Sequence, residues 1–207
     1  MSRELEVVHL EIVTCTKCEL HKGREKAVPG DGPVSAMVMF VGEGPGEKED
    51  QEGRPFVGAA GRLLTELLAS VGLNRNQVFI TNIVKCRPPN NRAPRQGEID
   101  ACNPYLEDQI RLVGPRILCP LGTPAIRTLM GTGYSAGQVH GKPVRMNERI
   151  MLPLYHPAAA LYDSSLKDVM FRDIGILKEL IQAESQPDTG HLSSRNANGE
   201  KSLQKWM

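Results

Sequence analysis

A glycine-rich, acidic segment in the first quarter of the chain is the first sign of chemistry. It reads Gly-Glu-Gly-Pro-Gly over residues 42–46 and follows the apolar run Ala36–Val41. Glycines let backbone N–H groups turn toward a ligand without a Cβ in the way, and Phe56 offers a flat face to a planar ring. The spacing fits neither G-x-G-x-x-G nor a P-loop. The segment therefore predicts a pocket for a flat, polar group, with a plain phosphate loop as the alternative.

Two polar side chains stand at the ends of later apolar runs. Asn82 interrupts the run Val78–Val84, and its amide could match a ring edge that presents both C=O and N–H. The alternative is an asparagine that bonds its own backbone at a turn. His156 precedes Pro157, and an imidazole there could donate to developing negative charge, although a lone histidine is more often structural.

The five cysteines form the third group of chemically active residues. Cys15 and Cys18 form a C-x-x-C pair, and Cys86 and Cys102 follow with fifteen residues between them. Four thiolates could hold either zinc or a four-iron four-sulfur cluster. The alternative is a redox pair at 15 and 18 and two ordinary buried cysteines. The odd count and the lack of a secretion signal argue against disulfides, and Cys119, within an apolar run, is predicted to be core.

These groups need a scaffold, and the apolar pattern predicts alternating strands and helices. Strands are expected over Ala36–Val41, Val78–Val84, Arg116–Pro120 and Arg149–Leu154. Helices are expected over Arg3–Val13, Gly61–Val71, Gly97–Leu112, Pro124–Leu129 and Leu166–Ala183. The pattern predicts a three-layer α/β/α sandwich with a central, mostly parallel, four-stranded sheet. Ligands of such sheets bind beyond the carboxyl ends of the strands, where the glycine segment, Asn82 and His156 all fall.

Composition limits the class of protein. The 207 residues, 40% of them hydrophobic, predict one domain over residues 1–184 and a polar, disordered tail over residues 185–207. With a net charge of +1, contacts to DNA must come from a local cluster of Lys and Arg. No stretch reaches the ~20 apolar residues of a membrane span, and the N-terminus shows no signal-peptide core, so a cytoplasmic protein is expected. A monomer is also expected.

Together these motifs resemble family 4, the iron–sulfur-containing branch of the uracil-DNA glycosylase superfamily. The resemblance covers roughly residues 1–180, and its motifs are Gly42–Gly46, Glu49-Asp50, Gly53–Gly58 and Ala60-Gly61, with Asn82, His156-Pro157 and four cysteines. It implies a DNA-repair enzyme that flips uracil out of single- or double-stranded DNA and hydrolyses its N-glycosidic bond. The product would be free uracil and an abasic site.

The resemblance also implies roles for individual residues. The ligands of a structural 4Fe-4S cluster would be Cys15, Cys18, Cys86 and Cys102. Phe56 would stack on uracil, Asn82 would read its edge, and His156 would stabilise the leaving group. The best-known branch of the superfamily has Asp where this chain has Gly44, so backbone N–H groups of the glycine loop, rather than a carboxylate there, would act on the substrate.

Two glutamates complete the predicted site. Glu43 is expected nearest the sugar, where it would stabilise oxocarbenium character or hold water; the alternative is that it caps donors of its own loop. Glu49 is a weaker candidate for excluding the thymine methyl group, because Gly46 replaces the tyrosine that does so elsewhere in the superfamily.

The DNA contacts are expected outside this pocket. Phosphates are expected along Arg87, Arg92 and Arg95. Leu161 is expected either to fill the vacated stack or simply to pack.

Two other classes of function stay open: a non-enzymatic iron–sulfur electron carrier, and a phosphate- or nucleotide-binding module. The first would explain the cysteines but not Phe56, Asn82 and His156. At the end of the chain, Glu200–Met207 places Leu203 and Trp206 at i and i+3, which resembles the clamp-binding box of replication proteins. This predicts recruitment to a sliding clamp; the alternative is a Trp206 that packs on its own domain.

Overall fold

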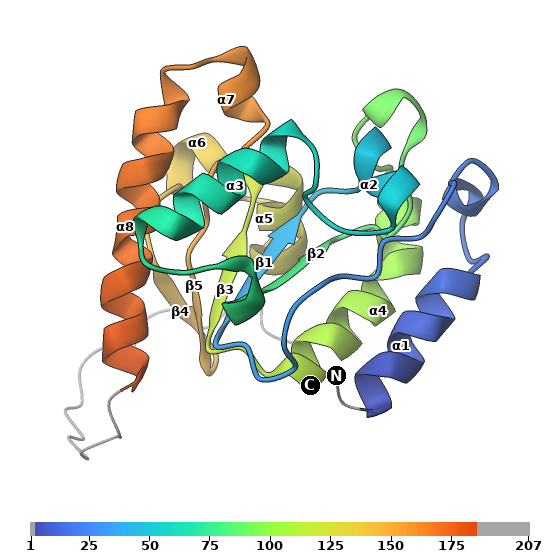
Figure 1. Cartoon of the computed structure of the whole chain (residues 1–207), viewed down its shortest axis with the longest axis horizontal. Helices are drawn as coiled ribbons and strands as arrows, with labels where there is room; N and C mark the ends of the chain where they lie inside the picture. The colour runs from blue at the N-terminus through green and yellow to red at the C-terminus, as the bar shows by residue number, and fades with distance from the viewer. Residues whose placement is uncertain (1–2, 186–207) are drawn as a thin grey trace.

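A five-stranded sheet runs through the centre of the computed structural model, which describes residues 3–185 (Figure 1). The strand order is β2-β1-β3-β5-β4. The strands are β1 (Val38–Gly42), β2 (Phe79–Asn82), β3 (Ile117–Pro120), β4 (Val144–Met146) and β5 (Arg149–Met151). All neighbours pair in parallel except β4 and β5, which are antiparallel.

The predicted count of four strands was wrong, because β4 was missed. This strand is only three residues long, Val144 is 43% exposed, and none of its residues is buried. An exposed edge strand of this length has no apolar run to mark it, and it exists only through its pairing with β5. Strands β2, β3 and β5 lie within the predicted ranges, and β1 extends one residue beyond its predicted end, to Gly42.

Helices cover both faces of the sheet, which confirms the three-layer architecture (Figure 1). Along β1, Val38 and Phe40 face one layer, and Met39 and Val41 face the other. The first layer consists of α3 (Ala59–Ser70) and α8 (Leu166–Ser185). The second consists of α1 (Arg3–Thr14), α4 (Gln96–Val113) and α5 (Gly122–Met130). All five helices were predicted, with ends that differ by a few residues.

Short helical segments occupy several of the connections. They are α2 (Glu47–Glu52), α6 (Ala136–Val139), α7 (Ala159–Tyr162) and the 3-10 turns Glu19–Lys22, Arg75–Gln77 and Pro89–Asn91. These segments were not predicted, because a single turn is too short to show a helical period. Several of them follow the carboxyl ends of strands, where ligand sites of such folds lie.

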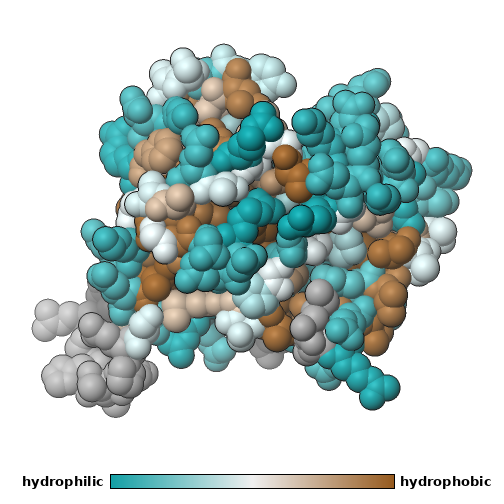
Figure 2. Space-filling view, in the orientation of Figure 1, coloured by the Kyte–Doolittle hydropathy of each residue, from teal (hydrophilic) through white to brown (hydrophobic). Residues whose placement is uncertain are grey.

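Helix α1 packs against α4 and closes a third apolar cluster beside the sheet. Its inward side carries Val8 and Ile12, both buried, whereas Leu10 on its outer side is 67% exposed. Figure 2 shows apolar side chains on the surface in this part of the molecule. In residues 3–185 no helix is long and apolar enough to cross a membrane.

Candidate active site

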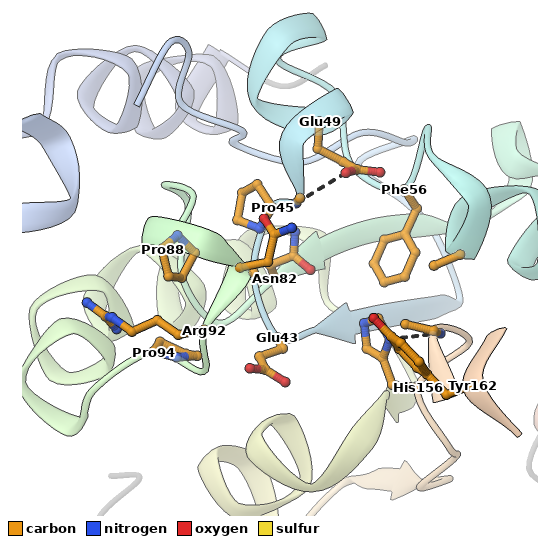
Figure 3. Close-up of a pocket in the computed structure, with 15 residues that line it drawn as sticks. Glu43, Pro45, Glu49, Phe56, Asn82, Pro88, Arg92, Pro94, His156 and Tyr162 are labelled. Atoms are coloured by element: carbon orange, nitrogen blue, oxygen red, sulfur yellow. Dashed lines mark hydrogen bonds between the residues drawn. The ribbon is translucent and has the colours of Figure 1, made fainter. Parts of the chain in front are cut away.

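A cavity of about 330 Å³ opens at the carboxyl ends of β1 and β2 (Figure 3). The structure brings six predicted site residues to its walls: Glu43, Gly44, Glu49, Phe56, Asn82 and His156. They come from three parts of the chain. One follows β1, the second is the end of β2, where Asn82 pairs with Gly42, and the third follows β5, which β3 separates from β1. The position agrees with the general placement of ligands at the carboxyl edge of parallel sheets.

Phe56 is held in a backbone conformation that is unusual for a residue with a side chain. Its φ is 53°, in the left-handed region. The guanidinium of Arg75 donates to the carbonyl oxygens of Phe56 (3.0 Å) and Pro55 (2.7 Å). A Cβ at Gly61 would collide with the Phe56 carbonyl, so only glycine allows this approach. The ring is therefore fixed by its backbone before any ligand binds.

Gly42 lets the aromatic ring and the amide share one wall of the cavity. A Cβ at this position would collide with the Asn82 Oδ1 and with the ring of Phe56. Asn82 is 1% exposed, and its Oδ1 has no hydrogen-bond partner within the described residues. An unsatisfied buried polar group costs about 1–3 kcal/mol. The amide is thus poised for a ligand rather than committed to a turn of its own backbone.

His156 is a neutral imidazole with a defined tautomer. Burial lowers its pKa to about 4, and the charge of Glu49 offsets only part of this shift. The Ala158 N–H donates to Nδ1 (3.1 Å), so in the neutral ring the proton is carried by Nε2. The ring lies 5.5 Å from that of Phe56, centroid to centroid. His156 can therefore present an uncharged N–H donor to a ligand beside Phe56.

The two glutamates differ in what they contact. The Glu43 carboxylate has no hydrogen bond or ion pair among residues 3–185, and burial raises its pKa. Glu49 accepts the backbone N–H groups of Gly46 (3.1 Å), Val57 (2.9 Å) and Gly58 (2.8 Å). Loop capping, the alternative considered for Glu43, is thus done by Glu49, which ties the glycine segment to the Phe56 loop. Exclusion of a methyl group by Glu49 stays a prediction.

The rim of the cavity contains residues that the sequence reasoning placed differently or missed. Arg92, expected along phosphates, is held by Glu98 through two hydrogen bonds (2.9 and 2.6 Å). Arg87 donates to Asn91 (2.8 Å). Tyr162 lines the cavity and is 93% exposed, next to Leu161, which is 54% exposed. The missed signal was an aromatic residue six positions after His156, at the end of the short helix α7.

Four cysteines line a second, smaller cavity between α1, α4 and the segment that follows β2. They are Cys15, Cys18, Cys86 and Cys102, and all are free thiols. Arg24 donates to the Cys86 sulfur (3.1 Å), although burial leaves the pKa of that thiol raised. Among the described residues, no group of three or more His, Cys, Asp or Glu is arranged to hold a single metal ion. Cys119 lies apart, in the sheet core, as predicted.

Lys85 lies between the two cavities and was also missed. Its Nζ donates to Thr81 Oγ1 (2.6 Å), to the Asn82 carbonyl (2.7 Å) and to Gln109 Oε1 (2.7 Å). Burial lowers the pKa of the ammonium to about 8, and the nearby Cys102 opposes part of the shift. A lysine directly after an apolar strand was the available signal, but its three acceptors are set by the fold.

Comparison with known proteins gives consistent relatives. The profile of the Uracil DNA glycosylase superfamily matches residues 29–175. A type-4 uracil-DNA glycosylase of Sulfurisphaera tokodaii is 50% identical, over 85% of this chain and 84% of its own. Those of Saccharolobus solfataricus and Thermotoga maritima are 44% and 41% identical, over 95% and 87% of this chain and 95% and 96% of theirs.

Proposed function

Because the chain belongs to the uracil DNA glycosylase superfamily, with type-4 enzymes as its relatives, we propose that its larger cavity receives uracil flipped out of DNA. The chain is a DNA-repair enzyme that hydrolyses the N-glycosidic bond of uracil. One observation carries the assignment of the site. The buried Asn82 amide oxygen, which has no partner within residues 3–185, lies in the same cavity as the Phe56 ring and a neutral His156.

Recognition is assigned to Phe56 and Asn82. The ring would stack on the flat face of uracil, and the amide would pair with an edge that carries both an acceptor and a donor. Gly42 keeps the two groups close enough to act on one base, since any side chain there would push them apart. A site built on such a pairing rejects bases whose edge leaves the amide unpaired.

Bond cleavage is assigned mainly to stabilisation of the departing base. Breaking the bond leaves negative charge on uracil, and the Nε2–H of neutral His156 would donate to it. A neutral donor suits this task because it stabilises the charge without handing over a full proton. Backbone N–H groups near Gly44 would add to this effect. The N–H of Gly46 is excluded, because it already donates to Glu49.

The sugar side is assigned to Glu43. Its carboxylate has no partner within the described part of the chain and lines the same cavity, so it is free to face positive charge or to hold a water molecule. A residue with a side chain does not fit easily at position 44, because a Cβ there would lie 2.9 Å from Val84 Cγ2. Water capture is thus assigned to Glu43 and not to position 44.

The cysteines are assigned to a 4Fe-4S cluster. The fit rests on four free thiols around one cavity and on the type-4 relatives. When bound, such a cluster would act as a structural cross-link between α1, α4 and the segment after Asn82. Metal analysis of anaerobically purified protein tests this assignment. Iron with sulfide is expected, and stoichiometric zinc without iron would contradict it.

Contacts to DNA are assigned to the rim of the larger cavity. Tyr162 lines this cavity, and Leu161 precedes it on the same short helix; both side chains are exposed. Arg95, the residue before α4, is also exposed. An exposed leucine or tyrosine can fill the space that a flipped base leaves. Since Arg92 is already bound to Glu98, Arg87 and Arg95 are the stronger proposals for phosphate contacts.

Recruitment to a sliding clamp is a separate proposal. The segment concerned, Glu200–Met207, lies outside the described residues, and only the spacing of Leu203 and Trp206 supports it. Calorimetry of this peptide against a trimeric clamp tests the proposal. Absence of heat at high micromolar concentration, with unchanged Trp206 fluorescence, would rule it out.

The function is tested by release of free uracil from an oligonucleotide with one uracil. The matched control carries thymine at the same position, and single- and double-stranded forms are compared because unstacking costs less in the former. Cleavage of the product at its abasic site by alkali should appear only with uracil. An iron-containing protein that releases no uracil from either form would favour the electron carrier instead.

A further inference from the structure

Lys85 is a buried cation that the roles assigned above do not use. Its side chain is 1% exposed, and no salt bridge joins it to a carboxylate in the part of the chain that the structure describes. A buried charge is costly unless it is well partnered, and an apolar residue of similar volume is often as stable or more so. A lysine at this place therefore needs a reason other than packing.

The hydrogen bonds of Lys85 are directed at the strand end that carries Asn82. An ammonium group has three donors, and three acceptors surround this one: Thr81 Oγ1, the Asn82 carbonyl oxygen and Gln109 Oε1. Two of these acceptors belong to residues three and four positions earlier, so the side chain folds back along its own segment. It thereby fixes the main chain of Asn82, whose amide faces the cavity.

The acceptors of Lys85 are themselves anchored. Gln109 donates through Nε2 to the Pro29 carbonyl (2.7 Å), and Thr81 Oγ1 is 2.9 Å from the same oxygen. Gln109 lies on α4, so the network ties the end of β2 to a long helix and to the segment before β1. The side chains of Thr81, Lys85 and Gln109 are buried, and a shift of Lys85 would be passed directly to Asn82.

The same residue faces the cysteines. Lys85 lines the smaller cavity. Burial raises the pKa of Cys102 to about 11, and the ammonium charge and main-chain N–H of Lys85 oppose part of that rise. Cys86 is the next residue in the chain. Lys85 thus contacts the wall of one cavity and the recognition residue of the other.

We propose that Lys85 is a positioning residue that holds Asn82 in place for uracil while its charge is balanced by the thiolates of the cysteine cavity. The inference rests on the proposed function of both cavities. Negative charge on the bound thiolates would offset the desolvation of the ammonium group. The placement of Asn82 then depends on the state of the cysteine cavity, although no cysteine touches the base.

Lys85→Met tests the proposal, because methionine fills a similar volume without charge or donors. Three quantities are measured on purified iron-containing protein: the inhibition constant of free uracil, the kcat and KM on a uracil oligonucleotide, and the reduction potential of the cluster. We expect about tenfold weaker uracil inhibition, because a misplaced amide loses its pairing. KM should rise more than kcat falls, and the potential should become more negative, since a nearby positive charge favours the added electron.

Lys17→Met is the matched control. Lys17 is exposed, and its Nζ lies 4.4 Å over the Tyr105 ring on the wall of the same cysteine cavity. This variant also removes a cation near the cysteines but leaves the contacts to Thr81, Asn82 and Gln109 intact. Uracil inhibition should stay at the wild-type value. Equal weakening in both variants would overturn the proposal, because it would mean that charge alone and not position matters.

A second pair of variants keeps the test decisive if Lys85→Met does not fold. Thr81→Ala removes one acceptor of Lys85, whereas Thr81→Ser keeps the hydroxyl. Weaker uracil inhibition in the alanine variant with recovery in the serine variant supports the proposal. Wild-type uracil inhibition in Lys85→Met, or in Thr81→Ala if the lysine variant is not stable, overturns it. A wild-type protein without iron and without uracil release would instead overturn the proposed function itself.

Discussion

The two cavities differ in whether the polar side chains beside them have hydrogen-bond partners. In the larger cavity, the Asn82 oxygen and the Glu43 carboxylate have no partner among the described residues. Beside the smaller one, Lys85 uses all three donors, and Arg24 is bonded to Cys86 and to the Val13 carbonyl. Unmet hydrogen bonds mark the place where a ligand is exchanged, and satisfied ones mark the place where a structure is held.

His156→Ala should give the largest loss in the cleavage reaction. Removing one donor to developing charge costs about 10²–10³ in rate, and His156 is the side chain best placed to donate. Single-turnover kinetics at saturating enzyme measures this step, with folding checked by thermal melting. A rate close to wild type would make the imidazole a packing residue and would remove the contrast between the two cavities.

Asn82→Ala should lower kcat/KM by about 10², the upper range for leaving a ligand's polar edge unpaired. The loss should be specific for the base, so inhibition by free uracil should weaken in parallel. Iron content should be unchanged, because the side chain itself contacts no cysteine. Wild-type turnover at normal iron content would show that another residue recognises the base.

Glu43→Gln should reduce the rate about tenfold, on the scale of one partly exposed charge interaction. Burial raises the pKa of Glu43, so the active carboxylate should be lost as the pH falls through a value above the usual range for glutamate. His156, with a pKa of about 4, stays neutral over that interval. A pH–rate profile should therefore show an acid limb that disappears in Glu43→Gln. Persistence of the limb in the variant would assign it elsewhere.

Cys86→Ala and Cys119→Ala should separate the two kinds of buried thiol, with the smallest direct effect on chemistry. The first should lose iron and melt at a lower temperature, because a link between α1, α4 and the segment after β2 is gone. Cys119 lies in the sheet core, so its variant should keep iron and lose only the packing energy of a small side chain. Equal iron content in both variants would exclude Cys86 as a ligand.

The sequence was sufficient for features that repeat along the chain. Continuous apolar runs marked β1 and β3, because both faces of these strands are buried, and amphipathic patterns marked α3 and α8. The carboxyl edge of the sheet then placed Asn82 and His156 near each other. Strand β4 was not predicted, because it is defined by its pairing with β5 and not by an apolar run of its own.

Side-chain hydrogen bonds that follow no helical or strand period were the main source of missed or incomplete assignments. From the sequence, Arg92 was predicted to be free to bind phosphate, but the structure pairs it with Glu98. Glu49 was predicted to act on the ligand, but it accepts three backbone N–H groups. Lys85 shows the same limit: its acceptor Gln109 is 24 residues away. The apolar period of a helix or strand does not show such pairings, and that of Lys85 follows from how α4 lies against the end of β2.

The clamped backbone of Phe56 has a consequence for how damage is found. Arg75 and Gly61 fix the ring before any base arrives, so no loop has to close over the base to build the stacking surface. A rigid receptor of this kind captures bases that have already left the helix and does little to pull them out. We expect excision to be fastest where thermal breathing of the duplex is frequent, so that the local melting of the DNA, and not a motion of the protein, sets the pace of repair.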